Sequence, residues 1–269
     1  MENQASEQKD EWASGTAYEP YVGRWSRLVA SEFLNWLAVP RGSRWLDVGC
    51  GTGALSRTIL QAAKPSHVKG IDQSEGYIAF VRAHIQDRRV RFEAGDALRF
   101  QDEAGSYDAV VTGLVLNFLP DPAQAVAEMS RAARSGGVVA GYVWDYAGKM
   151  QFMRHFWNAA GSLEPEAKDL DEGRRFPLCQ PEPLGQLFGG AGLNGVEVRA
   201  IDIWTEFQDF DDYWLPFLGG QGPAPGYTVS LSEERRVELR ERIRMGLPFS
   251  LDGSIPLVAR AWAVRGMKP

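Results

Sequence analysis

Three alternating glycines, preceded by an aspartate, form the most distinctive chemical pattern in this chain. Gly49, Gly51 and Gly53 alternate with other residues, and Asp47 stands shortly before the first of them. Glycine is needed where φ is positive, or where a ligand must approach the backbone with no side chain between them. A helix that starts after such a turn presents unpaired N–H groups and a partial positive charge. This turn can therefore hold a phosphate, or a carboxylate together with a ribose.

The spacing of the glycines does not by itself identify the ligand. Residues 49–54 formally match the dinucleotide fingerprint G-x-G-x-x-G/A, in which a pyrophosphate lies over the turn. Two features argue against a dinucleotide: Gly53 occupies a spacer position of that fingerprint, and the Asp47 carboxylate would repel a pyrophosphate. A carboxylate at this point suits a ligand that carries a positive ammonium group.

Short strands and helices alternate around this turn and must position it. Asp121 is expected to be an N-cap, with Pro122 at the first helical position. Such alternation is typical of parallel strands joined by right-handed crossovers, with helices on both faces of the sheet. We therefore expect an α/β fold with an open doubly wound sheet. The predicted strands are 44–48, 67–72, 90–94, 109–112 and 138–144, and the predicted helices are 25–37, 54–63, 75–86 and 121–134.

The regular alternation stops after residue 144. Residues 146–180 are aromatic and favour helix, without a clear strand. Residues 1–17 are polar and are expected to form a flexible lead-in. The later predicted elements are a helix at 182–192, a strand at 196–204, a charged helix at 232–245 with Ser232 as its N-cap, and a last strand at 257–264.

The composition limits the class of protein. Of 269 residues, 44% are hydrophobic and 24% are charged, as in a soluble globular chain. Lys and Arg total 29 against 35 Asp and Glu, and the resulting net charge of −6 disfavours nucleic acid as a partner. Cys50 and Cys179 are too few for a disulfide framework or a cysteine-rich zinc site, so we expect no metal and a reducing compartment. We expect neither a signal peptide nor a membrane span, and hence a cytoplasmic location.

Residues 46–53 resemble the first motif of the class I S-adenosylmethionine-dependent methyltransferases, where an acid and three alternating glycines follow a short strand. The resemblance covers residues 44–145. It implies a Rossmann-like doubly wound sheet of seven strands, mostly parallel, with the last strand antiparallel and with helical lid insertions. It also implies S-adenosyl-L-methionine as the cofactor. The residues that it places at the cofactor are Tyr21, Trp25, Asp47, Gly49, Cys50, Gly51, Gly53, Asp72, Gln73, Tyr77, Asp96, Ala97, Thr112 and Leu114.

The resemblance gives some of these residues particular roles. Asp72, at the end of the second strand, is expected to accept the ribose hydroxyls, and Asp96 the adenine amino group. In the lead-in to the first helix, Tyr21 and Trp25 are expected to close over the methionine end of the cofactor, although Trp25 equally suits the core. Asn117 stands where many relatives carry histidine, so any role for an imidazole there is lost.

The methyl acceptor is expected to bind outside the repeating core, within a single methyltransferase domain spanning residues 18–269. Segments 145–180 and 205–250 are expected to form the lid and the acceptor pocket. Their aromatic side chains favour a small hydrophobic or aromatic metabolite, and they also suit a satellite core beneath a lid. His155 is the one histidine placed to act as a general base, should the acceptor need one. The aromatic residues in question are Trp144, Tyr146, Phe152, Phe156, Trp157, Trp204, Phe207, Phe210, Tyr213, Trp214 and Phe217.

Two other functions stay open at this stage. An NAD(P)-dependent oxidoreductase would need a dinucleotide across the glycine turn, which Asp47 opposes. A non-catalytic protein that keeps the cofactor pocket is the second alternative. A macromolecular acceptor is less favoured, because residues 112–115 lack the Asn/Asp-Pro-Pro-Tyr type of motif. The sequence leaves the oligomeric state and the identity of the acceptor open.

Overall fold

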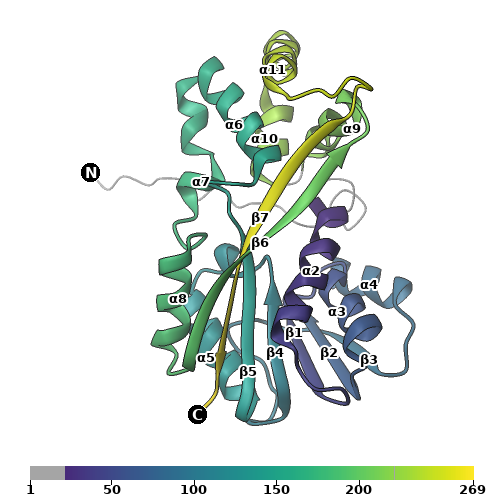
Figure 1. Ribbon diagram of the computed structural model, residues 1–269, viewed down its shortest axis with the longest axis vertical. Coiled ribbons are helices and arrows are strands. Elements are labelled where there is room, and N and C mark those ends of the chain that lie inside the picture. The colour runs from purple at the N-terminus through teal and green to yellow at the C-terminus, as the bar shows by residue number, and fades with distance from the viewer. Residues whose placement is uncertain (1–21, 221) are drawn as a thin grey trace.

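The computed structural model describes residues 22–220 and 222–269. They contain one seven-stranded sheet with the strand order β3-β2-β1-β4-β5-β7-β6 (Figure 1). The chain therefore runs outward from β1 in both directions, as expected of a doubly wound sheet. The strands are β1 (Arg44–Val48), β2 (His67–Asp72), β3 (Val90–Ala94), β4 (Tyr107–Gly113), β5 (Ala133–Trp144), β6 (Asn194–Phe207) and β7 (Ile255–Met267).

The strand directions confirm the predicted fold class. β1 pairs in parallel with β2 and with β4, while β7 is antiparallel to both of its neighbours, β5 and β6. The central strands are short apolar runs because both of their faces are covered; Leu46 and Val110, for example, are fully buried. All parallel strands end at one edge of the sheet, so the loops that follow them meet there.

Helices cover both faces of this sheet (Figure 1). α2, α3 and α4 lie on one side, and α5 and α8 lie on the other. Asp121 caps α5 by accepting the N–H of Gln124, with proline next in the chain, as predicted. The helices are α2 (Arg24–Leu37), α3 (Ala54–Thr58), α4 (Glu75–His84), α5 (Pro122–Ala132), α6 (Gln151–Leu163), α7 (Glu172–Arg175), α8 (Pro181–Gly190), α9 (Phe210–Trp214), α10 (Pro223–Ser230) and α11 (Glu233–Gly246).

Most predicted boundaries differ from the structure by a few residues, and two differences have a clear structural origin. The helix predicted at 54–63 is α3 followed by a π-helical turn, η2 (Ile59–Ala63). The strand predicted at 138–144 begins earlier, at Ala133. The register of the β4–β5 pairing shifts after Ala133, and Gly136 and Gly137 lie in this irregular stretch. Gly136 has a φ of +69°, and a Cβ on Gly137 would lie only 2.8 Å from the Arg134 carbonyl oxygen.

The segments after β5 form a second helical group around the ends of β6 and β7, where α6, α9, α10 and α11 gather (Figure 1). Most of their aromatic side chains stack on one another: Phe152 contacts Phe207, Tyr213 and Phe217 within this cluster. Trp204, by contrast, is 74% exposed. The satellite-core interpretation therefore describes most of these residues. Among the described residues, none of the helices combines the length and apolar character that a membrane crossing requires.

Candidate active site

A cleft lies where the parallel strands end, between the glycine turn after β1 and the ends of β2, β4 and β5. Val22, just before α2, and Ser26, in the first turn of α2, close it on one side. Residues from distant parts of the chain meet here because the strands that carry them end at the same edge. The predicted site residues that line the cleft are Asp47, Gly49, Cys50, Gly51, Asp72, Gln73, Tyr77 and Leu114.

The three glycines of the turn all have positive φ, but they serve different purposes. A Cβ on Gly49 would lie 2.5 Å from the Val115 side chain, and one on Gly53 would lie 2.5 Å from Val81. These two glycines permit close packing. A Cβ on Gly51 would meet no atom within 4 Å, since this residue faces the open cleft. Gly51 is therefore the position where a ligand can approach the bare backbone.

Hydrogen bonds tie the glycine turn to the end of β2. The N–H groups of Gly49 and Cys50 both donate to the Ile71 carbonyl, over 2.8 and 2.9 Å. The Gly51 N–H donates to Asp72 Oδ2 over 2.9 Å. Asp72 Oδ1 accepts the N–H of Ser74 over 2.9 Å. Each Asp72 oxygen thus keeps a further lone pair with which to accept a ligand hydroxyl at the cleft.

Asp47 is a buried carboxylate, only 1% exposed. Its Oδ2 accepts the hydroxyl of Ser56 over 2.7 Å, while its Oδ1 has no hydrogen-bond partner among the described residues. Burial, with a smaller contribution from the nearby Asp72 charge, raises the pKa of Asp47 to about 7. A buried carboxylate oxygen without a partner, at the wall of a cleft, is an acceptor that a cationic ligand would satisfy.

The opposite end of the cleft is aromatic. Phe118 follows β4, and Tyr142, Trp144 and Tyr146 come from the end of β5 and the residues beyond it. Trp144 and Tyr146 are among the aromatic residues predicted for the acceptor pocket, whereas Phe118 and Tyr142 are not. Alternation along the strand was a usable signal, because Tyr142 and Trp144 project to the same face of β5.

Leu114, between the two ends of the cleft, has a φ of +63°. Its N–H donates to the Tyr142 carbonyl over 2.8 Å, which holds the backbone in this conformation. Non-glycine residues seldom adopt positive φ, and such strain concentrates at binding sites.

The other predicted site residues that the structure describes lie outside the lining of the cleft. Trp25 packs edge-on against Phe207, and Thr112 is buried with its hydroxyl donating to the Val48 carbonyl over 2.8 Å. Asp96 is exposed after β3, and Ala97 beside it is buried. Gly53 belongs to the packing described above, and Tyr21 lies outside the described residues.

His155 does not belong to this cleft. It lies half-buried on α6, where burial lowers its pKa. Within the described part of the chain, no histidine lines the cleft. The proposed general base therefore has no geometric support.

Comparison with known proteins agrees with this architecture. Residues 46–141 match the family model described as a methyltransferase domain. The chain is 31% identical over 182 residues to a demethylmenaquinone methyltransferase of Roseiflexus sp., a match that covers 62% of this chain and 74% of that protein. It is 38% identical over 112 residues to a ubiquinone biosynthesis O-methyltransferase of Aromatoleum aromaticum, covering 39% of this chain and 47% of the relative's length.

Solved structures show the same fold at low sequence identity. A putative methyltransferase from Bacillus halodurans has a TM-score of 0.59 at 16% identity, covering 89% of this chain and 98% of that one. A phosphoethanolamine N-methyltransferase from Haemonchus contortus, solved with S-adenosyl-L-methionine, has a TM-score of 0.59 at 18% identity. That match covers 94% of this chain and 56% of that one. Together with the glycine turn and the strand order, these matches show that the chain belongs to the class I S-adenosylmethionine-dependent methyltransferase family.

Proposed function

We propose that this protein transfers a methyl group from S-adenosyl-L-methionine to a small apolar acceptor with an aromatic ring. One observation carries the proposal: a single cleft joins two carboxylates at one end to an aromatic wall at the other. The carboxylate end suits a cationic amino acid attached to a ribose, and the aromatic end suits a flat apolar molecule. The cofactor at the carboxylate end must lie next to the acceptor at the aromatic end for the methyl group to be transferred.

The residues at the carboxylate end fit this cofactor. The unpartnered Oδ1 of Asp47 would accept the ammonium group, and the Asp72 carboxylate would accept the ribose hydroxyls. Gly51 leaves room for a ligand against the backbone, since nothing lies within 4 Å of its Cβ position. Gln73 and Tyr77, which line the cleft just after β2, would flank the nucleoside.

When bound, the cofactor supplies a methyl group that its sulfonium already makes electrophilic. The protein's task is then to align the acceptor atom behind that methyl group and to exclude water. Alignment alone can lower the barrier by about 7–11 kcal/mol. Leu114 lies between the two ends of the cleft, with its backbone fixed by the Tyr142 carbonyl, and it is suited to separate and orient the two ligands.

The aromatic wall and the relatives together support a ring-shaped acceptor. Phe118, Tyr142, Trp144 and Tyr146 offer flat apolar faces with few charged groups. The relatives carry names that point to ubiquinone biosynthesis and to demethylmenaquinone. We infer an acceptor of this general kind, a small aromatic or quinone-like molecule, and we place its methylation in the cytoplasm, where the buried thiols of Cys50 and Cys179 stay reduced.

A screen of methyl acceptors tests this proposal. The purified protein would be incubated with methyl-labelled cofactor and a set of phenols, hydroquinones, amines and carboxylic acids. We expect the label to appear by mass spectrometry in a ring-bearing acceptor. Transfer to none of these classes, despite tight cofactor binding, would favour the non-catalytic alternative.

Cofactor affinity is expected to depend on pH through Asp47. The pKa of about 7 means that Asp47 holds a proton below neutral pH and must release it to pair with a cation. The affinity should therefore fall as pH decreases, by about tenfold per pH unit between pH 6 and pH 5. Calorimetric titrations between pH 5 and pH 7 measure this slope. An affinity that stays constant over this range would show that Asp47 does not pair with the ligand.

Asp72→Ala is expected to weaken cofactor binding by at least about tenfold, the effect of losing hydrogen bonds to a charged group. Equilibrium dialysis or calorimetry measures the change. Glu75→Ala is a matched control, because it removes a charge from an exposed residue nearby that does not line the cleft. An equal loss in both variants would indicate a long-range charge effect and would contradict the ribose assignment.

A further inference from the structure

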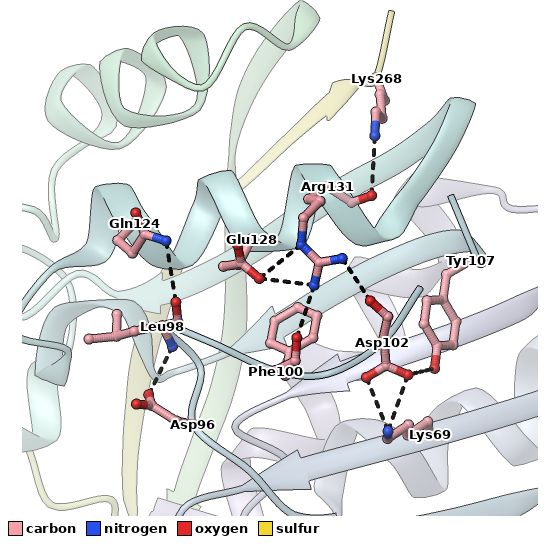
Figure 2. Close-up of polar contacts among 10 residues, drawn as sticks. All are labelled: Lys69, Asp96, Leu98, Phe100, Asp102, Tyr107, Gln124, Glu128, Arg131 and Lys268. Atoms are coloured by element: carbon pink, nitrogen blue, oxygen red, sulfur yellow. Dashed lines mark hydrogen bonds and ion pairs between the residues drawn. The ribbon is translucent and has the colours of Figure 1, made fainter. Parts of the chain in front are cut away.

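Residues 95–106 connect β3 to β4 without a helix or strand of their own, yet they are fixed by side chains from neighbouring elements (Figure 2). Two donors come from α5. Arg131 donates from Nη1 to the Asp102 carbonyl over 2.7 Å and from Nη2 to the Phe100 carbonyl over 3.0 Å. Gln124 donates from Nε2 to the Leu98 carbonyl over 3.3 Å. One face of α5 therefore sets the path of this connection.

The sheet holds the same connection from the other side. The Asp102 carboxylate accepts two hydrogen bonds from the ammonium group of Lys69, on β2, over 3.0 and 3.1 Å. It also accepts the hydroxyl of Tyr107, on β4, over 2.7 Å (Figure 2). Asp102 is thus a fixed point, and Arg131 joins that point to α5.

These contacts lead directly to Asp96. The N–H of Leu98 donates to Asp96 Oδ1 over 2.9 Å, while the carbonyl of the same residue accepts the bond from Gln124. The start of the connection is placed by β2, because the N–H of Gly95 donates to the Asp72 carbonyl over 3.0 Å. Asp96 therefore stands close to the ribose end of the cleft, and its carboxylate is oriented by a residue that α5 holds.

We propose that Arg131 and Gln124 are positioning residues that hold residues 96–102 in the conformation that presents Asp96 to the cofactor's adenine. This inference rests on the proposed function and on the adenine role that the family resemblance implies for Asp96. Neither positioning residue lines the cleft. They act on base selectivity through Asp96 and not by touching the ligand.

The test compares the affinities for two nucleosides that differ at position 6 of the purine, where a carbonyl replaces the amino group and the neighbouring ring nitrogen gains a hydrogen. S-adenosylhomocysteine carries the amino group, and S-inosylhomocysteine carries a carbonyl oxygen there, which a carboxylate repels. We expect the wild-type protein to prefer the adenine form by about tenfold, the factor of one hydrogen bond to a charged group. In Arg131→Met and in Gln124→Ala this preference should fall to within about twofold, with Arg131→Lys intermediate.

Glu128→Gln is the matched control. Glu128 accepts from Arg131 Nε and Nη2, both on α5, and glutamine keeps an oxygen that can accept these bonds. Among the described residues, Glu128 has no hydrogen bond to the 95–106 connection. Its substitution should leave the preference unchanged. In an Asp96→Ala background, Arg131→Met should not change the preference further, because Arg131 acts on the adenine only through Asp96.

Several results would overturn the positioning role while leaving the proposed function intact. These are a wild-type protein that binds both nucleosides equally, or Arg131→Met and Gln124→Ala variants that weaken both nucleosides by the same factor. Gln124 is an exposed side chain whose loss leaves the core intact, so the Gln124→Ala variant decides the matter if Arg131→Met fails to fold. A wild-type protein that binds neither nucleoside would instead contradict the proposed function itself.

Discussion

Gly51→Val is expected to abolish cofactor binding while the protein stays folded. The new side chain would project into the open cleft, where nothing lies within 4 Å of the Cβ position, and would occupy the space that the ligand needs. We expect the affinity for S-adenosylmethionine to fall at least a hundredfold, which is about 3 kcal/mol. Calorimetry would measure the loss, and circular dichroism would confirm the helix content.

Gly42→Val is the control for this prediction. Gly42 also has a positive φ and open space around its Cβ position, but it lies in the turn before β1, away from the cleft. Both variants force valine into a left-handed conformation at a cost of about 1–2 kcal/mol. Only Gly51→Val should lose the cofactor. Equal losses of binding would mean that backbone strain, and not occupation of the cleft, is responsible.

Asp47→Asn is expected to make the ligand-free protein more stable and the cofactor affinity much weaker. Because burial raises the pKa of Asp47 to about 7, the folded state binds a proton between pH 4 and pH 7 that the unfolded state has released. The free energy of unfolding therefore falls as pH rises through this range, and it stays low above pH 7. Removing the ionisable group should recover about 1–3 kcal/mol at pH 8, as measured by chemical denaturation.

The same substitution removes the carboxylate that we propose as the partner of the ligand's ammonium group. We expect the cofactor affinity at pH 7.5 to fall by about thirtyfold to a hundredfold, in line with 2–3 kcal/mol for a charged hydrogen bond. Asp108→Asn is the control, because the pKa of Asp108 is lowered where that of Asp47 is raised. Its pKa is lowered by the Arg44 N–H and by Arg134, and it lies away from the cleft. That variant should lose stability and keep its affinity. An Asp47→Asn protein that is less stable and binds normally would contradict the account.

The sequence was sufficient to predict the glycine turn and the carboxylates because their positions depend on local structure. Asp47 and Asp72 each stand at the end of a short apolar strand, and parallel pairing alone brings those ends together. The signal lies in a few consecutive residues, so no distant contact was needed. For the same reason the strands and most of the helices were predicted to within a few residues.

The aromatic end could be predicted only in part, through Trp144 and Tyr146, since the rest depends on contacts between distant segments. Tyr142 packs against Phe33 of α2 with a centroid distance of 4.8 Å, and Trp25 turns toward Phe207, on β6. The segments expected to form the acceptor pocket instead bury most of their rings in their own cluster. The Arg131 contacts could not be predicted for the same reason. They join α5 to backbone carbonyl groups of an irregular connection, and the positions of carbonyl groups leave no pattern in the sequence.

The most direct test of the central claim is the structure of the protein crystallised with S-adenosylhomocysteine. The account predicts the amino acid part of the ligand beside Asp47, the ribose beside Asp72 and the sulfur facing the aromatic wall. A ligand that binds elsewhere, or a cleft that takes up NAD in preference to this nucleoside, would contradict it.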